Sequence, residues 1–324
     1  MPTSPRPYQF AVLGNAVVDA FAPAIDELLA AHGLTKGDST TLSLPAMLKL
    51  AESVTVQQFR SGGSSANTAY TLGALGARTC FIGKIGQDPT GRHFAEDMVK
   101  VGVTVTPLQA NHRTTEVFIL VTPDGVRTMA QQQPAEPSPD DSWVDESLIE
   151  QSQCLLLGTY AMGSYPAACV FAAKTARHAG TKLVISLASP RAVQGAGQTL
   201  VDMVAEHKPL VIGNHAEWET LCAMADAHTV RQLERTPRVI TRSGEGAAYY
   251  SGDGMVVDSP NQPIPRPTDM SGAGDAFAAG FMRSFFGGAS PQLALQHGHQ
   301  LGRATVLQMG ARLEVVPDLV HGTD

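Results

Sequence analysis

The chain is poor in the features that mark disulfide-bonded, membrane-bound or nucleic-acid-binding proteins. Its four cysteines form no Cys-x-x-Cys pair, and Cys80 and Cys154 fall in apolar stretches, so we expect buried, reduced thiols. Charged residues make up only 16% and the formal net charge is −7, which gives no basic surface for nucleic acid or an anionic membrane. No apolar run approaches the ~20 residues that span a bilayer, and the first residues lack the apolar core of a secretory signal. We therefore expect a cytoplasmic chain.

Several common catalytic motifs are missing as well. The chain has no Gly-x-x-x-x-Gly-Lys-[Ser/Thr] loop and no Gly-x-Ser-x-Gly elbow. Gly272 and Gly274 are not followed by a third glycine, because position 277 is Phe277, so the dinucleotide-binding pattern is incomplete. His297 and His299 stand two residues apart in a helical stretch, where they point to different faces, and we expect no metal pair there.

What the chain does contain is a regular alternation of apolar strand-like runs and helical segments. This alternation favours a mostly parallel sheet with helices on both faces, and 43% hydrophobic residues suit an ordinary globular enzyme. The sequence thus predicts an α/β fold, a three-layer αβα sandwich. The expected strands are Phe10–Leu13, Thr79–Ile82, Leu155–Leu157, Leu183–Leu187, Leu210–Ile212 and Val239–Thr241, and the expected helices are Ala66–Leu75, Gly91–Val101, Pro166–Ala179, Ala192–Glu206 and Glu217–Ala225.

Two stretches interrupt this alternation with β-rich sequence. Thr114–Ala130 reads as strand, turn and strand, with Pro123-Asp124-Gly125 as the turn, and Val54–Phe59 also has β character. A small separate sheet inserted in an α/β chain is typical of a lid over an active site. We predict one domain over residues 1–324, with lid segments at about 16–60 and 112–131 and a polar linker at Gln131–Asp141.

Residues 269–277, Asp-Met-Ser-Gly-Ala-Gly-Asp-Ala-Phe, begin a helical stretch. Gly272, Ala273 and Gly274 leave room for an anion to approach several backbone N–H groups, where the helix dipole adds roughly half a positive charge. Asp275 places a carboxylate beside that anion hole, where it can collect the proton of a hydroxyl group. An acid in the first turn of a closely packed helix is the structural alternative.

A second informative stretch is Ser61-Gly62-Gly63-Ser64-Ser65-Ala66-Asn67. The two glycines end a strand and allow a polar ligand to touch the backbone, while Ser64 or Ser65 is expected to cap the next helix. Asn67 then falls in the first turn with its side chain toward a cleft. An ordinary strand-to-helix turn is the alternative.

Both segments resemble the signatures of the ribokinase (PfkB) family of carbohydrate and nucleoside kinases. The second signature, Asp-Thr-x-Gly-Ala-Gly-Asp-x-Phe, matches at every fixed position except Met270, which replaces a threonine. Asn214-His215-Ala216-Glu217 resembles the family's Asn-x-x-Glu, and Thr241-Arg242-Ser243-Gly244-Glu245-Gly246 is similar to its nucleotide-side turn. The first signature is matched by Gly62, Gly63, Asn67, Leu75, Gly76, Gly83, Gly86, Asp88 and Gly91.

The resemblance implies a role for each matching residue. Asp275 is the expected catalytic base, and Gly272, Ala273 and Gly274 form the expected anion hole for the transferred phosphoryl group. Asp19, Gly62, Gly63 and Asn67 are the expected acceptor-binding residues; Asn214, Thr241, Ser243, Gly244 and Gly246 are expected to bind the nucleotide; and Glu217 is expected to hold Mg²⁺ through water. ATP and Mg²⁺ are the implied cofactors, and a monovalent cation such as K⁺ stays open, because Met270 removes a hydroxyl near the anion hole.

Three segments most resemble bacterial adenosine-kinase-like members, namely Gly14–Asp19, Ile119–Met129 and Thr241-Arg242-Ser243-Gly244. We therefore expect a kinase for the primary hydroxyl of a ribonucleoside. A free-sugar kinase for fructose, ribose or a ketodeoxy acid is one alternative, and a catalytically silent sugar- or nucleoside-binding regulator is another. Phe21, Phe59 and Phe118 are candidates to stack on a base. The expected partners are ATP and the small acceptor, with no nucleic acid or membrane, in a monomer or a homodimer.

Overall fold

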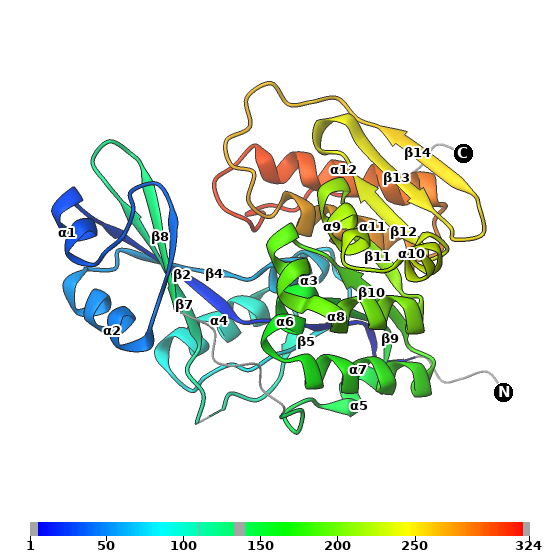
Figure 1. Ribbon diagram of the computed structural model, residues 1–324, viewed down its shortest axis with the longest axis horizontal. Coiled ribbons are helices and arrows are strands. Elements are labelled where there is room, and N and C mark those ends of the chain that lie inside the picture. Colours follow the sequence, from blue (N-terminus) through cyan, green and yellow to red (C-terminus); the bar gives the residue numbers. More distant parts are fainter. Residues whose placement is uncertain (1–5, 110, 133–139, 320–324) are drawn as a thin grey trace.

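The computed structural model describes residues 6–109, 111–132 and 140–319 (Figure 1). Within these ranges nine strands form one large sheet in the order β14-β13-β12-β11-β10-β9-β1-β5-β6. The pairs from β6 to β12 are parallel, and the two pairs at the other edge, β12–β13 and β13–β14, are antiparallel. The strands are β1 (Tyr8–Leu13), β5 (Thr79–Ile82), β6 (Thr104–Val105), β9 (Ser152–Gly158), β10 (Lys182–Ser186), β11 (Leu210–Asn214), β12 (Arg238–Thr241), β13 (Gly246–Tyr250) and β14 (Val256–Pro260).

Helices cover both faces of this sheet because its central strands are apolar on both sides. Val12 belongs to the core on one face and its neighbour Leu13 to the core on the other. One face packs against α3 (Ser64–Ala74), α4 (Pro89–Lys100), α11 (Ala273–Phe285) and α12 (Pro291–Val306). The other packs against α5 (Glu146–Glu150), α6 (Thr159–Ser164), α7 (Pro166–Ala179), α8 (Pro190–His207), α9 (His215–Ala223) and α10 (Ala227–Glu234). The predicted three-layer α/β fold is confirmed.

A second sheet, called the small sheet below, projects to one side of these layers (Figure 1). Its described strands lie in the order β3-β8-β7-β2-β4. They have a core of their own with two helices, in which Phe118 and Leu120 pack near Leu50. The elements are β2 (Val17–Pro23), β3 (Ser39–Leu42), β4 (Gln58–Gly62), β7 (Thr115–Val121), β8 (Arg127–Gln132), α1 (Asp26–Ala31) and α2 (Leu44–Ser53).

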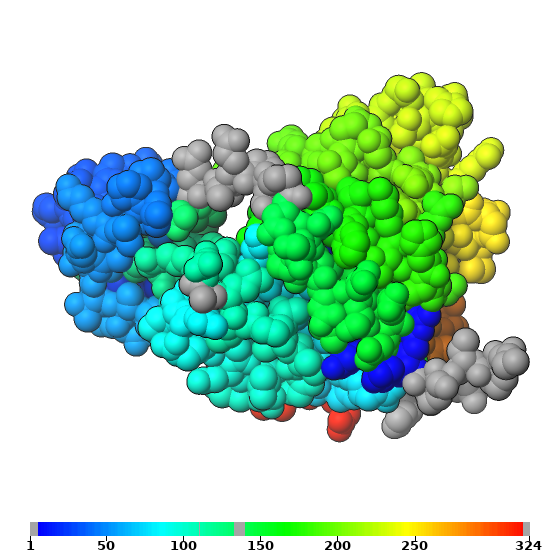
Figure 2. All heavy atoms as spheres, turned by 90° about the horizontal axis from the view of Figure 1, so that it is seen from below, coloured from blue at the N-terminus to red at the C-terminus, as the bar shows by residue number. Residues whose placement is uncertain are grey.

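The small sheet joins the large one through two short connections. Strand β2 begins shortly after β1 ends, and β4 leads through Gly63 directly into α3. Figure 2 shows the N-terminal part of the small sheet and its helices, in blue, standing out from the body. Residues of the small sheet near β1 and α3 are therefore held next to the carboxyl ends of the large sheet's strands.

Some sequence-based boundaries were wrong. The β character assigned to Val54–Phe59 belongs to a later strand, because Val54 ends α2 and β4 begins only at Gln58. Much of the predicted linker, residues 133–139, lies outside the described residues. Cys80 and Cys154 are buried free thiols, as expected. Among the residues that the structure describes, no helix is long and apolar enough to cross a membrane.

Candidate active site

The candidate site lies at the carboxyl ends of the parallel strands. Gly14 follows β1 there, Gly158 ends β9 and Asn214 ends β11. Ligands of open α/β sheets bind at this edge, because loops rather than helices occupy it. Helix α3 packs against α11 beside the same edge, so the two segments singled out in the sequence are brought together.

The glycine turn before α11 has a backbone that requires glycine. Gly272 is the N-cap residue with φ of 73°, in the left-handed region. A Cβ atom at Gly272 would also lie 2.4 Å from the backbone oxygen of Ala311. At Gly274, in contrast, a Cβ atom would meet nothing within 4 Å, so this position faces open space. The free N–H groups of this first turn are thus accessible to an anion.

Asp275 stands in that first turn and is bonded by two side chains of α3. Ser64 Oγ donates to Oδ1 at 2.6 Å, and Asn67 Nδ2 donates to Oδ2 at 3.1 Å. Burial raises the pKa of Asp275 to about 6, while these two hydrogen bonds and the charge of Arg312 lower it. The carboxyl is therefore held in a fixed orientation and is mostly ionised at neutral pH.

The expected capping role of Ser64 or Ser65 needs correction, while Asn67 lies in the first turn of α3 as expected. The N-cap of α3 is Gly63, whose φ of 92° only glycine adopts easily, and neither serine caps the helix. Ser64 instead bonds Asp275, and Ser65 lies so close to Gly158 that a Cβ there would be 1.8 Å from its Oγ. Asn67 is buried and bonded to Asp275, so its amide does not simply face a cleft.

Asp19 on β2 offers a second carboxylate at the same place. A Cβ atom at Gly62 would lie 3.2 Å from Asp19 Oδ2, so the glycine leaves this carboxylate room. Burial raises the pKa of Asp19 to about 6, whereas the charges of Arg312 and Arg60 lower it. Among the described residues no donor forms a hydrogen bond to this carboxylate, although its side chain keeps partial exposure. It is free to accept hydrogen bonds from a ligand.

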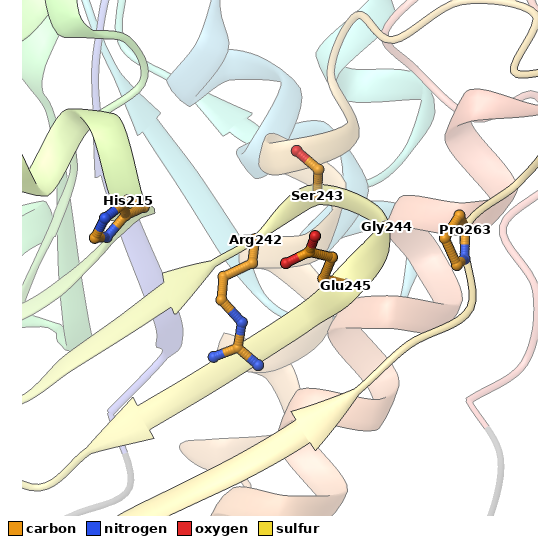
Figure 3. Close-up of a pocket in the computed structure, with 6 residues that line it drawn as sticks. All are labelled: His215, Arg242, Ser243, Gly244, Glu245 and Pro263. Atoms are coloured by element: carbon orange, nitrogen blue, oxygen red, sulfur yellow. The ribbon is translucent and has the colours of Figure 1, made fainter.

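A cavity of 540 Å³ lies between the β12–β13 turn and the loop after β14. Figure 3 shows Pro263 on one side of the short helix η1 (Ser243–Glu245) and His215 of α9 on the other. The Arg242 guanidinium forms an ion pair with Asp258 at 2.6 Å. The lining residues are His215, Arg242, Ser243, Gly244, Glu245 and Pro263.

The nucleotide-side predictions divide into residues inside and outside this cavity. Ser243 and Gly244 line it, whereas Thr241 uses its hydroxyl to donate to the Gly213 oxygen at 3.4 Å. Gly246 is required by the backbone at this turn. Its φ is 120°, and a Cβ atom at this position would lie 2.2 Å from the Ser259 oxygen. Four lining residues were missed. His215, Arg242 and Glu245 adjoin the predicted positions in sequence, and Pro263 carries no sequence signal.

Asn214 and Glu217 form a capping box at the start of α9. Asn214 N and Nδ2 donate to the two oxygens of Glu217 at 2.8 and 2.7 Å, and Glu217 N donates to Asn214 Oδ1 at 2.9 Å. Burial raises the pKa of Glu217, and the charge of Asp275 raises it further. A hard cation near both carboxylates would relieve this repulsion, so the residues fit Mg²⁺. Among the described residues, no cluster of three or more metal-binding side chains occurs.

Three arginines that the sequence did not single out lie around the acceptor side. Arg60 faces Asp19 across the β2–β4 pair, and a Cβ at Gly310 would lie 2.9 Å from its Nη1. Arg127 of β8 reaches to 3.9 Å from Asp269 Oδ2, the oxygen that accepts a hydrogen bond from Gly310 N at 3.0 Å. Arg312 Nε donates to Asn67 Oδ1 at 3.0 Å. The small sheet and the loop after α12 thus both contact Asp269, at the start of the segment that leads into α11.

The aromatic candidates have different surroundings. Phe118 lies in the core of the small sheet, and Phe21 is covered by the Arg60 guanidinium at 5.2 Å. Phe59 is 43% exposed beside His93, while Tyr160, which the sequence did not mark, is 46% exposed on α6. Phe118 is therefore not available to stack on a ligand.

Two sequence features remain, namely Met270 and the pair His297 and His299. Met270, which replaces the threonine of the signature, is 60% exposed. Ser284 forms a hydrogen bond with His297 Nδ1, and His299 Nε2 lies 3.1 Å from the Ser259 oxygen. These contacts engage the two histidines with different neighbours, in keeping with their different faces on α12.

The chain matches the model of the pfkB family of carbohydrate kinases over residues 28–318. A nucleoside kinase of Methanothermobacter thermautotrophicus is 27% identical over 233 residues, which cover 70% of this chain and 72% of that protein. A 5-dehydro-2-deoxygluconokinase of Bacillus subtilis is 29% identical over 253 residues, covering 73% of this chain and 78% of that protein. The crystal structure of adenosine kinase from Sinorhizobium meliloti superimposes with a TM-score of 0.79 at 26% identity, covering 95% of this chain and 97% of that chain.

Proposed function

The chain belongs to the pfkB family of carbohydrate kinases, and we propose that it transfers the γ-phosphoryl group of ATP to the primary hydroxyl of a ribonucleoside, with adenosine the first candidate. Kinase activity follows from the family. The nucleoside acceptor is supported by the likeness over most of the chain to an adenosine kinase structure and by the similarity to a nucleoside kinase. The proposal holds equally for a monomer and a homodimer, and the use of ATP suits a cytoplasmic location.

One observation carries the chemical part of the proposal. Asp275 stands in the first turn of α11 directly after the exposed Gly274, and Asp19 on β2 offers a carboxylate that accepts no hydrogen bond from the described residues. An anion hole beside a carboxylate can bind a phosphoryl group and a hydroxyl group together. The second carboxylate can accept hydrogen bonds from the other hydroxyl groups of the acceptor.

Each group of residues in the site has one task in the proposed phosphoryl transfer. The acceptor oxygen bonds to the γ-phosphorus, the bond from that phosphorus to the bridging oxygen of ADP breaks, and the hydroxyl proton passes to Asp275. The free N–H groups at the start of α11, that of Gly274 among them, stabilise the charge on the phosphoryl oxygens. Mg²⁺, when bound near Asn214 and Glu217, supplies further neutralisation of the phosphate charge. Residues on the small sheet hold the acceptor and keep water away, which is the expected role of a lid.

A free-sugar acid is the second candidate acceptor, and two arginines favour it. Arg60 and Arg312 both influence Asp19, and guanidinium groups at an acceptor pocket suit a carboxylate. The similarity to a 5-dehydro-2-deoxygluconokinase points the same way. A catalytically silent regulator has the least support, because a pure binder has no use for a base beside an anion hole.

The acceptor is tested by measuring ADP formation with a panel of nucleosides, neutral sugars and sugar acids, with mass detection of each product. We expect a ribonucleoside 5′-monophosphate as the main product. A phosphorylated sugar acid formed faster than any nucleotide would replace the first candidate with the second. ATP-dependent phosphorylation of none of these compounds would contradict both.

A further inference from the structure

Arg312 comes from the loop after α12 and ends among residues of the catalytic centre. Its Nε donates to Asn67 Oδ1 at 3.0 Å, and Asn67 Nδ2 in turn donates to Asp275 Oδ2 at 3.1 Å. Because the oxygen of the Asn67 amide is taken by Arg312, its nitrogen must face Asp275. The chain of hydrogen bonds therefore fixes the rotation of the amide and, through it, the carboxylate.

The charged guanidinium group of Arg312 is buried against aromatic side chains. Its carbon lies 4.8 Å from the ring centre of Tyr70 on α3 and 5.7 Å from that of Phe94 on α4. Within the described residues, the buried Nη1 and Nη2 atoms have no hydrogen-bond partner. Burying a cation without a direct ion pair is costly, and the aromatic faces offset only part of the cost. Stability alone gives no reason to keep an arginine here.

We propose that Arg312 is a positioning residue for the phosphoryl transfer, which holds Asn67 and thereby the carboxylate of Asp275 in the orientation that receives the acceptor proton. This inference rests on the proposed kinase reaction. It assigns a role to Arg312 in the loop after α12, a residue that the sequence did not single out.

The charges around Asp275 come from several elements. Asp19 of β2 and Asp97 of α4 each interact with the Arg312 charge, as does Asp275 itself. Arg60 of β4 acts on Asp19, and Asp275 acts on Glu217 of α9. Asp97 is bonded by Ser61 Oγ at 2.7 Å and by Lys100 at 2.9 Å, so its charge is largely engaged.

Arg312 is thus the cation that these carboxylates share. It lowers the pKa of both Asp275 and Asp19 against the effect of burial, and removing its charge raises both pKa values.

The test compares Arg312→Met, which removes the charge and the hydrogen bond, with Arg312→Lys, which keeps the charge and loses the planar donor. For Arg312→Met we expect kcat to fall about tenfold to 100-fold, and the acidic limb of kcat/KM to move up by about one pH unit. For Arg312→Lys we expect a lower kcat on the alkaline plateau with the limb near its original position. The KM for ATP should stay within about twofold in both variants, since Arg312 lies on the acceptor side.

A second readout does not depend on turnover. The carboxyl carbon of Asp275 is titrated by NMR in protein labelled at aspartate, with Asp275→Asn to assign its signal. The midpoint should rise in Arg312→Met and stay near its original value in Arg312→Lys. A folded Arg312→Met protein with an unchanged midpoint and an unchanged pH profile would overturn the proposal. If the wild-type enzyme phosphorylates no acceptor, the proposed function fails, while the titration still decides the role of Arg312.

Discussion

The proposed acceptor side of the site is assembled from distant segments, whereas the proposed nucleotide side comes largely from one turn. Ser64 and Asp275 are 211 positions apart and Arg312 and Asn67 are 245 apart, yet each pair shares a hydrogen bond. The nucleotide cavity takes most of its lining from residues 242–245. The acceptor side also concentrates buried charge, while the arginine of the nucleotide side forms a partly exposed ion pair. The difference predicts that substitutions on the acceptor side affect turnover and its pH dependence, and that those on the nucleotide side affect nucleotide affinity.

The largest expected effect is that of Asp275→Asn. The amide cannot take the hydroxyl proton, so we expect kcat to fall by about 10³-fold to 10⁴-fold while acceptor and ATP binding stay within a few-fold. Calorimetric titration measures binding, and product analysis measures turnover. Asp253→Asn, at an exposed turn beside β13, is the matched control and should be active. Phosphorylation by Asp275→Asn at the wild-type rate would disprove the assignment of the base.

Asp19→Asn tests the second carboxylate through activity and stability together. Loss of a charged acceptor for the ligand's hydroxyl groups should lower kcat/KM for the acceptor about 100-fold.

The stability of Asp19→Asn depends on pH with a defined sign. The folded-state pKa of Asp19 is about 6, above its ordinary value of 3.8, so the folded protein binds this proton more tightly than the unfolded chain. The free energy of unfolding therefore falls as pH rises between these two values, and a residue that cannot ionise escapes the loss. Asp19→Asn should be more stable than wild type by about 2 kcal/mol at pH 8 and no more stable at pH 4. Denaturant unfolding at the two pH values measures the difference in free energy of unfolding between Asp19→Asn and wild type. An equal difference at pH 8 and pH 4 would show that folding does not raise the pKa of Asp19.

Gly274→Ala tests the anion hole with an internal control in the same turn. A Cβ atom at Gly274 meets no protein atom within 4 Å, so the folded protein should tolerate it, and any loss must come from the ligand. We expect the melting temperature to stay within about 2 °C and kcat to fall about tenfold.

Gly272→Ala should behave differently, because its Cβ would lie 2.4 Å from the Ala311 oxygen and φ is positive. It should lose about 1–3 kcal/mol of stability as well as activity. A fully active Gly274→Ala enzyme would show that the Gly272–Gly274 turn does not bind the transferred phosphoryl group.

The contrast between the two sides also explains how far the sequence could be interpreted. The continuous apolar runs of buried parallel strands, such as β9, identified the three layers, because their pattern is local. The turn at Gly272–Asp275 was visible for the same reason. Ser64 was misread as a cap, because nothing local reveals that Gly63 takes the N-cap position and that Asp275 lies opposite.

The residues that could not be predicted from the sequence differ between the two sides in the same way. Arg312 follows α12 and reaches Asn67 of α3 because α11 packs against both α12 and α3, an arrangement that no short pattern encodes. On the nucleotide side, Arg242 and Glu245 were within the turn already marked and were missed only by one or two positions. Pro263 lies on a separate loop and could be found only in the structure.

The smallest expected effect, that of Arg242→Ala, sharpens the comparison from the nucleotide side. Arg242 lines the cavity and its ion pair with Asp258 is partly exposed, and such pairs contribute about 1 kcal/mol at most. We therefore expect the KM for ATP to rise by about fivefold or less, with kcat and the KM for the acceptor nearly unchanged.

Asp258→Asn is the matched control for Arg242→Ala, since it removes the partner while keeping the guanidinium in the cavity. If the guanidinium attracts the nucleotide, Asp258→Asn should leave the KM for ATP unchanged or lower it, and the effect of Arg242→Ala should shrink in high salt because the charges are accessible to solvent. A fall in kcat at unchanged KM for ATP would place Arg242 with the residues that act on the transferred group, and the division between the two sides would then fail.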